Sequence, residues 1–246
     1  MKAMIFAAGL GTRLKPITDT LPKALVPVGG RPLIEHVVRK LKASGIEEVV
    51  VNVHHFADKI QDWVSQQDIM DIQVSDERKE LLETGGGILQ ARQYLDGCGR
   101  FLIHNVDILS DIDLEWFGRS FPEDAMAALL VSERETSRYL LFDPETMRLV
   151  GWTNVKTGEV RSPYMSLNPA GCVRMAFSGI HIMSDKVFDV MEEYSDNPRF
   201  PIIDFYLSIC AEHKIYGVPA KELHMIDVGK LDSLQQAESM ARNLGL

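Results

Sequence analysis

Long hydrophobic runs are missing from the sequence, although 46% of its 246 residues are hydrophobic. No apolar stretch reaches the roughly 18 residues that a bilayer-spanning helix needs. The stretch at 4–8 is too short for a signal peptide and is followed by Arg13 and Lys15, so we expect a buried first strand there. The sequence therefore predicts a cytoplasmic protein without membrane contact, and one α/β domain over residues 1–246.

Cysteine and positive charge are also scarce. Cys98, Cys172 and Cys210 are scattered and form no C-x-x-C pair, which fits a reducing cytoplasm and neither a disulfide framework nor a zinc site. The formal net charge of −9 argues against sequence-independent nucleic-acid binding, because such binding needs a basic face. Arg and Lys nevertheless cluster in residues 13–31, which indicates either a small anionic ligand or a solvated surface.

The first half of the chain alternates between strand and helix patterns. Apolar, β-branched runs predict strands, and apolar residues at helical spacing predict helices. This alternation favours a parallel sheet with helices on both faces, in which ligands bind beyond the carboxyl ends of the strands. The predicted strands are 4–8, 47–53, 72–75 and 100–106, and the predicted helices are 33–41, 56–64 and 86–95.

After residue 121 the pattern changes to short strands joined by polar turns. A loop or hairpin arm is expected at 157–171, where two prolines and two glycines argue against a helix. The predicted strands are 126–132, 139–142, 149–152, 173–183, 216–219 and 224–228, and the predicted helices are 186–194, 201–212 and 231–243.

The loop after the first predicted strand must be distinguished from a dinucleotide-binding turn. Gly9 and Gly11 match the start of the fingerprint G-x-G-x-x-G, but Leu14 occupies the position of its third glycine. That fingerprint also requires a helix directly after the glycines, and Pro16 and Pro22 block one. The Walker pattern G-x-x-x-x-G-K-[ST] is absent as well. These features disfavour an NAD-binding oxidoreductase.

What remains is an extended loop that carries two glycines and two well-spaced cations. Backbone N–H groups beside Gly9 and Gly11 can form a nest for an anion, and Arg13 offers a planar fork of donors for phosphate oxygens. Lys23 is a point charge on a long stem, which suits a phosphate whose charge grows during a reaction. The alternative is an ordinary loop with exposed basic residues, and the two cations on one loop favour the anion site.

Longer motifs resemble a known family. The segment GLGTRLKPITDTLPKALVPV (9–28) resembles the signature of nucleoside-triphosphate sugar-1-phosphate nucleotidyltransferases. The segments LETGGGI (82–88), FSGI (177–180) and DVG (227–229) are similar to the base-contacting loop and the later motifs of that family. The chain length and LETGGGI resemble the bacterial N-acetylmuramate-1-phosphate uridylyltransferases of peptidoglycan recycling, and mannose-1-phosphate guanylyltransferases are close relatives.

The resemblance implies a fold and a reaction. The fold is an α/β three-layer sandwich with a mostly parallel, Rossmann-like central sheet of the nucleotide-diphospho-sugar transferase type. Its nucleotide-binding half would be 1–120 and its sugar-phosphate-binding half 121–246. A sugar 1-phosphate would attack the α-phosphorus of a nucleoside triphosphate, and pyrophosphate would be released. The substrates that the resemblance favours most are UTP and N-acetylmuramate 1-phosphate. The resemblance implies Mg²⁺ as the metal, no nucleic-acid partner, and a monomer or homodimer.

The resemblance also assigns roles to individual residues. Arg13 and Lys23 would be the catalytic cations, and Asp107 and Asp227 would hold the metal. The nucleotide would lie against Ala8, Gly9, Gly11, Thr12, Glu83, Gly85 and Gly86. The sugar phosphate would be bound by Asn105, Arg138, Lys156 and Gly179.

The chain departs from the family pattern at two places. Val106 precedes Asp107 where the family usually has glycine, so a side chain is added beside the metal position. The Glu-Lys-Pro segment whose Lys holds the sugar phosphate in many relatives is absent. Arg138 and Lys156 are candidates to replace that Lys, and the alternative is that both are cations on an exposed hairpin.

Several alternatives stay open at this point. A GTP-dependent mannose-1-phosphate guanylyltransferase and a cytidylyltransferase acting on a phosphorylated small alcohol would use the same chemistry. A regulator that binds a nucleotide sugar without catalysis would be expected to lack Arg13, Lys23 or a metal aspartate, and all of these are present. Glu83 either bonds the base or caps the helix predicted at 86–95.

Overall fold

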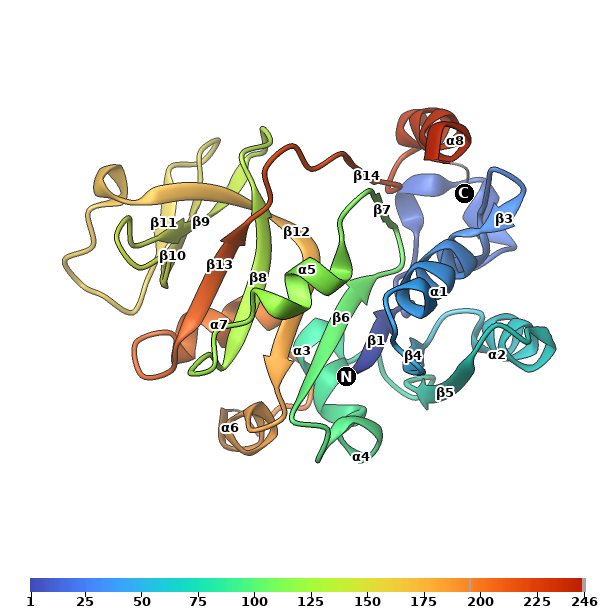
Figure 1. Cartoon of the computed structure of the whole chain (residues 1–246), viewed down its shortest axis with the longest axis horizontal. Helices are drawn as coiled ribbons and strands as arrows, with labels where there is room; N and C mark the ends of the chain where they lie inside the picture. Colours follow the sequence, from blue (N-terminus) through green and yellow to red (C-terminus); the bar gives the residue numbers. More distant parts are fainter. Residues whose placement is uncertain (195, 245–246) are drawn as a thin grey trace.

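The computed structural model describes residues 1–194 and 196–244, and its elements follow the predicted alternation closely (Figure 1). The strands are β1 (Lys2–Phe6), β2 (Pro27–Val28), β3 (Arg31–Pro32), β4 (Glu48–Val53), β5 (Asp71–Asp76), β6 (Arg100–Asn105), β7 (Ile108–Ser110), β8 (Ala127–Ser132), β9 (Arg138–Phe142), β10 (Leu149–Asn154), β11 (Glu159–Arg161), β12 (Val173–Ser184), β13 (Ile215–Pro219) and β14 (Met225–Asp227). The helices are α1 (Leu33–Ala43), α2 (Ala57–Gln66), α3 (Glu83–Gln90), α4 (Arg92–Leu95), α5 (Leu114–Arg119), α6 (Val187–Tyr194), α7 (Ile202–Ile209) and α8 (Leu231–Leu244).

In the described part of the chain, ten strands form one sheet in the order β11-β10-β9-β12-β6-β1-β4-β5, with β8 beside β12 and β13 beside β8. The strands β5, β4, β1 and β6 are parallel to one another. Strand β12 is antiparallel to both β6 and β8, so β8 and its parallel neighbour β13 point the same way as β1. The central sheet is therefore mixed but mostly parallel, as predicted, and β9, β10 and β11 extend it as an antiparallel arm.

Alternate residues of β1 point into two different hydrophobic cores, because successive side chains of a strand face opposite sides of a sheet. Ala3 and Ile5 pack with apolar residues of α1, α2, α5 and α8. Met4 packs with residues of α3, α4, α6 and α7. Each core contains residues from both halves of the chain. The helices thus cover both faces of the sheet, which confirms the predicted three-layer sandwich.

Helix α1 shows why the sequence pattern was informative. Its leucine, isoleucine and valine residues recur every three or four positions and are all at most 1% exposed, so one stripe of the helix faces the core. Fully burying a side chain of this kind contributes about 1.5–3 kcal/mol, far more than the propensity of any single residue. The buried stripe consists of Leu33, Ile34, Val37, Val38 and Leu41.

The loop between β1 and α1 is more compact than the extended loop that we predicted. It contains three short 3-10 turns, η1 (Thr12–Leu14), η2 (Ile17–Asp19) and η3 (Lys23–Leu25). Leu14 is fully buried, and Thr18 donates a hydrogen bond from its Oγ1 to the carbonyl oxygen of Gly11 at 2.8 Å. These contacts hold a loop whose prolines prevent an α-helix, and the first α-helix begins only at Leu33.

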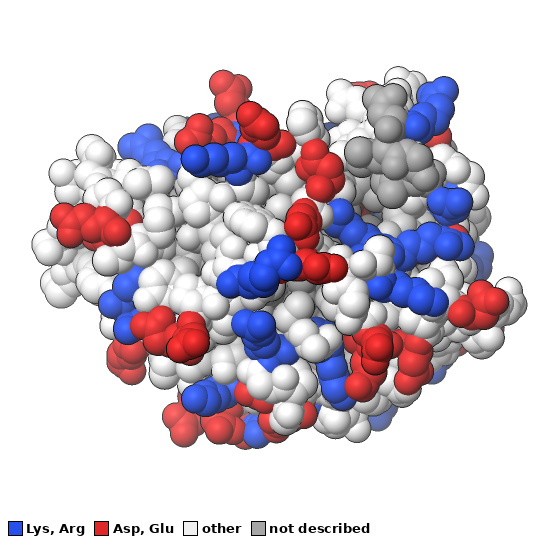
Figure 2. Space-filling view, in the orientation of Figure 1, with Lys and Arg blue, Asp and Glu red and all other residues white. Residues whose placement is uncertain are grey.

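The surface carries side chains of both charges, as the sequence composition requires (Figure 2). On the face shown in Figure 2, basic and acidic side chains are interspersed over much of the surface, and several basic side chains lie together at the right of the view, over α1 (Figure 1). Across the ranges 1–194 and 196–244, the search for a helix long and apolar enough to cross a membrane finds none.

Candidate active site

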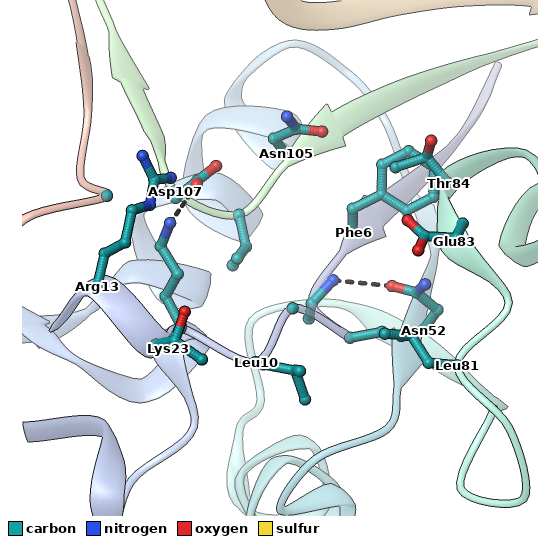
Figure 3. Close-up of a pocket in the computed structure, with 17 residues that line it drawn as sticks. Phe6, Leu10, Arg13, Lys23, Asn52, Leu81, Glu83, Thr84, Asn105 and Asp107 are labelled. Atoms are coloured by element: carbon teal, nitrogen blue, oxygen red, sulfur yellow. Dashed lines mark hydrogen bonds and ion pairs between the residues drawn. The ribbon is translucent and has the colours of Figure 1, made fainter. Parts of the chain in front are cut away.

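A cavity of about 420 Å³ opens at the carboxyl ends of β1, β4 and β6 (Figure 3). We call it the strand-end cavity. The loop after β1, the start of α3 and the residues after β6 form its walls. This is the position at which open α/β sheets bind ligands, because the loops there leave a crevice between neighbouring strands.

One end of the strand-end cavity carries charged side chains. Arg13, Lys23 and Asp107 lie together there, as Figure 3 shows. Lys23 is only 9% exposed, and its Nζ forms an ion pair with Oδ2 of Asp107. Lys23 lies in η3, which is held in place by the fully buried Ala24 beside it. The two cations predicted from the loop therefore converge on one of the predicted metal-binding carboxylates.

The second predicted carboxylate, Asp227, reaches the same place through a small two-stranded sheet. Strand β14 pairs antiparallel with β7, and this pairing sets Asp227 opposite Ile108. The backbone N–H of Val228 donates a hydrogen bond to the carbonyl oxygen of Asp107 at 2.8 Å. Two aspartates that are far apart in the sequence are thus brought to neighbouring positions.

The electrostatics of Asp227 reflect this proximity. Partial loss of solvation raises the pKa of Asp227 above its usual range, and the negative charge of Asp107 raises it further. The positive charges of Lys23, Arg13 and Arg134 act in the opposite direction on the same pKa. Asp227 therefore belongs to one charged group with the residues at this end of the cavity.

Gly229 keeps this group compact. A Cβ atom at Gly229 would lie 2.8 Å from Nη2 of Arg13 and 2.8 Å from Oδ1 of Asp227. Both distances are shorter than carbon atoms normally approach such groups, so a larger residue would push the guanidinium or the carboxylate away. The DVG motif therefore combines a carboxylate with a position that has no room for a side chain.

The predicted nucleotide-binding residues of the first loop all line the strand-end cavity. They are Ala8, Gly9, Gly11 and Thr12. Gly11 has a φ of 63°, a left-handed conformation that glycine adopts without steric cost. The loop therefore lays its backbone along the cavity wall, where N–H groups can meet phosphate oxygens.

The opposite end of the cavity is polar, and the sequence analysis did not single out one of its residues, Asn52. Asn52, at the end of β4, is 2% exposed, and its Oδ1 accepts a hydrogen bond from the N–H of Ala7 at 2.8 Å. Its Nδ2 donates to Oε1 of Glu77 at 2.7 Å. Burial raises the pKa of Glu77, and this hydrogen bond opposes the rise. The signal for Asn52 was a polar residue inside the otherwise apolar run VVVNV.

Glu83 lines the same end of the cavity, together with Thr84, which we had not singled out. The carboxylate of Glu83 pairs with Arg199 at 2.8 Å, measured from Oε1 to Nη2. Helix α3 begins at Glu83 rather than at the predicted residue 86. Glu83 has a φ of 62°, which is uncommon for a residue with a side chain.

Gly85 and Gly86 lie behind the cavity wall rather than in it. Both are buried, and their N–H groups donate to the carbonyl oxygen of Phe200 at 2.8 and 3.2 Å. Neither Gly85 nor Gly86 is among the described residues that line the strand-end cavity. Because the two glycines have no side chains, the segment before α7 can pass close to α3. The Oγ1 of Thr84 also joins these elements, since it accepts a hydrogen bond from the N–H of Ile202 at 2.8 Å.

Asn105 and Gly179 are in contact with each other. Asn105 lines the strand-end cavity, and a Cβ on Gly179 would lie 2.8 Å from its Nδ2. Gly179 has a φ of 73° and lies where the pairing of β12 with β8 shifts register. Val106, the departure from the family pattern, is 4% exposed, and it both lines the strand-end cavity and packs into the core.

Arg138 and Lys156, the remaining candidates for the sugar phosphate, lie apart from each other. Arg138 lines a second cavity of about 410 Å³ between β9, β10 and the start of α7, which we call the arm cavity. Lys156 lies exposed in the turn between β10 and β11. For the described residues, Lys156 is not part of the lining of either cavity.

This fold and this arrangement of cations and carboxylates place the chain in a class of phosphate-handling enzymes. The chain belongs to the nucleotidyl transferase family, whose model matches residues 2–243. It is 34% identical over 236 residues to the N-acetylmuramate alpha-1-phosphate uridylyltransferase of Caulobacter vibrioides, covering 91% of this chain and 90% of that protein. It is 31% identical over 246 residues to the protein of the same name from Neisseria meningitidis serogroup B, covering 98% of each.

Solved structures share this fold. A putative glucose-1-phosphate thymidylyltransferase from Bacillus anthracis superposes with a TM-score of 0.80 at 22% identity, covering 99% of this chain and 96% of that one. A UDP-glucose pyrophosphorylase in complex with UDP-glucose superposes with a TM-score of 0.78 at 18% identity, covering 99% of each chain. At this level of identity, the likeness establishes the fold.

Proposed function

We propose that the protein joins UTP to N-acetylmuramate 1-phosphate and releases pyrophosphate. The observation that carries this proposal is the convergence of Arg13, Lys23, Asp107 and Asp227 at one end of the strand-end cavity. The choice of base and sugar is supported by the two curated relatives, which match the chain over nearly their whole length and carry that name. Peptidoglycan recycling in the cytoplasm is the setting that this activity would serve.

The chemistry is a displacement at phosphorus. An oxygen of the sugar 1-phosphate forms a bond to the α-phosphorus, and the bond from that phosphorus to the bridging oxygen breaks, so that the electron pair leaves with pyrophosphate. Such transfers depend on positioning and on stabilising charge, rather than on covalent participation of the protein. Arg13 would bind the β- and γ-phosphates and stabilise the leaving pyrophosphate, and Lys23 would offset charge at the α-phosphate.

The two aspartates suit Mg²⁺, which proteins usually hold through one or two carboxylates while substrate phosphates and water complete its octahedron. The charge of Asp107 already perturbs the pKa of Asp227, so a divalent cation would relieve repulsion between the two groups. Bound Mg²⁺ would neutralise phosphate charge and align the reacting phosphates.

The nucleoside would extend from the charged end toward the polar end of the cavity. The backbone of residues 8–12 would follow the phosphates and ribose, and the base would lie near Asn52, Glu83 and Thr84. Gly85 and Gly86 would then support the base-binding segment from behind, by letting α3 approach the carbonyl oxygen of Phe200. A guanylyltransferase or cytidylyltransferase would use the same charged end, so the base is tested separately.

The test is an assay of pyrophosphate release with each of the four nucleoside triphosphates, a panel of sugar 1-phosphates and Mg²⁺. We expect the highest kcat/KM with UTP and N-acetylmuramate 1-phosphate, and no release in EDTA. Asp107→Asn removes a full charge from the metal site and should lower kcat by roughly 100-fold or more. Asp58→Asn is a matched control, because it removes an exposed carboxylate that pairs with Arg78 away from the cavity.

Three outcomes would count against this proposal. No release with any pair of substrates would favour a regulator that binds nucleotide sugars. Near wild-type activity of Asp107→Asn would contradict the metal assignment. A clear preference for GTP with mannose 1-phosphate, or for CTP with a phosphorylated small alcohol, would keep the reaction class and replace the substrates.

A further inference from the structure

The arm cavity is strongly basic for a chain with a net charge of −9. Three arginines line it, and in the described part of the chain Asp204 is its one acidic lining residue. Arg161 pairs with Asp204 at 2.7 Å, measured from Nη1 to Oδ1, so this pair is neutral overall. The two arginines that remain, Arg134 and Arg138, leave an excess of positive charge in the cavity.

Arg138 is the arginine most available to a ligand. It is exposed, and its guanidinium has no ion pair or hydrogen bond with any other residue that the structure describes. Arg134, by contrast, donates from Nη2 to the carbonyl oxygen of Phe177 at 2.9 Å and acts on the charge of Asp227. Among the three arginines that line the arm cavity, Arg134 and Arg161 each have a partner, and the guanidinium of Arg138 has none in the described part of the chain.

The rest of the lining suits a sugar. The rings of Tyr139, Trp152 and Phe177 provide apolar surface, and a few polar groups stand among them, which is typical of small-molecule sites. The guanidinium of Arg161 lies 4.5 Å from the ring centroid of Trp152, and its partner Asp204 holds it there. This wall is therefore organised before any ligand arrives.

Two contacts join the arm cavity to the strand-end cavity. Thr84, which lines the strand-end cavity, is hydrogen-bonded to Ile202, which lies between two lining residues of the arm cavity, Pro201 and Ile203. Phe177, a lining residue of the arm cavity, is separated by one residue from Gly179, which lies against Asn105 of the strand-end cavity. The arm cavity therefore borders the strand-end cavity near Thr84 and Asn105, so that a sugar bound with its 1-phosphate in the first cavity could extend toward the second.

We infer that the arm cavity binds a carboxylate carried by the sugar, and that Arg138 is the residue that selects for it. This inference rests on the proposed function, and it assigns Arg138 to the sugar substituent rather than to the phosphate shared by all sugar 1-phosphates. N-acetylmuramate 1-phosphate has such a carboxylate on its lactyl ether, and N-acetylglucosamine 1-phosphate lacks it. Arginine suits this role, because its planar fork matches a carboxylate with two parallel hydrogen bonds.

The experiment measures kcat and KM for both sugars with UTP and Mg²⁺. The wild type should prefer the carboxylate-bearing sugar, and Arg138→Gln should reduce this preference at least about 10-fold, mainly through KM, because a hydrogen bond to a charged group is lost. Arg138→Lys should retain part of the preference. Arg174→Gln is the matched control, since Arg174 is exposed on β12 outside the lining of the arm cavity. Thermal unfolding of each variant checks that the fold is intact.

The outcomes separate this inference from the proposed function. If Arg138→Gln lowers kcat/KM equally for both sugars, Arg138 serves the shared phosphate and the inference is wrong. An active wild type that uses both sugars equally well would also overturn it, while leaving the nucleotidyl transfer in place. If no pair of substrates releases pyrophosphate, the proposed function fails and the inference falls with it.

Discussion

Asn52→Ala tests how the first loop is held over the sheet. Asn52 joins two elements, because its Oδ1 accepts from the N–H of Ala7 at 2.8 Å and its Nδ2 donates to Glu77 at 2.7 Å. Both Asn52 and Glu77 are 2% exposed, so water cannot readily replace the lost amide. In the variant, the buried N–H of Ala7 and the buried carboxylate of Glu77 each lose the hydrogen bond that Asn52 provides in the wild type.

The expected loss of stability follows from these two groups. An unpaired buried polar group costs about 1–3 kcal/mol, and a hydrogen bond to a charged group contributes about 1.5–3 kcal/mol. Because Glu77 keeps a long contact of 3.4 Å from the N–H of Leu82, we expect a combined loss of about 3 kcal/mol in the free energy of unfolding. In a chain of this size 1 kcal/mol shifts Tm by about 2–4 °C, so Tm should fall by about 6–12 °C.

The assay combines thermal and urea unfolding with KM for the nucleoside triphosphate. KM should rise, because the loop that begins at Ala7 loses its tether to β4. Asn154→Ala is the control, since the side chain of Asn154, the last residue of β10, accepts a single hydrogen bond, from the N–H of Lys156 in the turn that follows. The double variant Asn52→Ala/Glu77→Gln should lose less than the sum of the single changes, because both residues belong to one network. A fall in Tm no larger than that of the control would refute the reasoning.

Two further predictions follow from the same site and its surroundings. Gly229→Ala should lower kcat by roughly 10- to 100-fold with little change in Tm, because the Cβ of the new alanine would displace Arg13 or Asp227. Steady-state kinetics measures this effect, and a variant with unchanged kcat would contradict the prediction. Burial lowers the pKa of His104 to about 4 and that of His181 to about 3, below the usual value near 6.5. The unfolded chain therefore takes up protons first as the pH falls, and each histidine should cost roughly 2 kcal/mol of stability between pH 7 and pH 5. Urea unfolding at both pH values measures this loss, and equal stability at the two would show that the histidines are not buried in their neutral form.

Some boundaries were misplaced because the deciding contacts are not local. The helix predicted at 86–95 begins at Glu83 and is interrupted at Ala91, between α3 and α4. The N–H groups of Gly85 and Gly86 in LETGGGI donate to the carbonyl oxygen of Phe200, a contact that the sequence analysis did not predict. No pattern within residues 82–88 reveals that a segment more than a hundred residues later will pack there.

The sequence by itself determined the order of strands and helices, the mostly parallel sheet and the charged loop. These features depend on residues that are neighbours in the chain: the helical stripe of α1, the β-branched run of β4, and the prolines that delay the first helix until Leu33. Arg13 and Lys23 lie within one continuous motif, so their joint role could be predicted from spacing. Periodicity and backbone stereochemistry act locally, and the sequence records them directly.

Only the tertiary structure decided how distant side chains meet. The pairing of β7 with β14 brings Asp227 to Asp107, and neither strand is strong enough in the sequence to predict the register. The same is true of Asn52 beneath the first loop and of Arg138 in a separate cavity from Lys23. Long-range contacts of this kind depend on how whole layers pack, because burial in a shared core, rather than any local preference, sets their geometry.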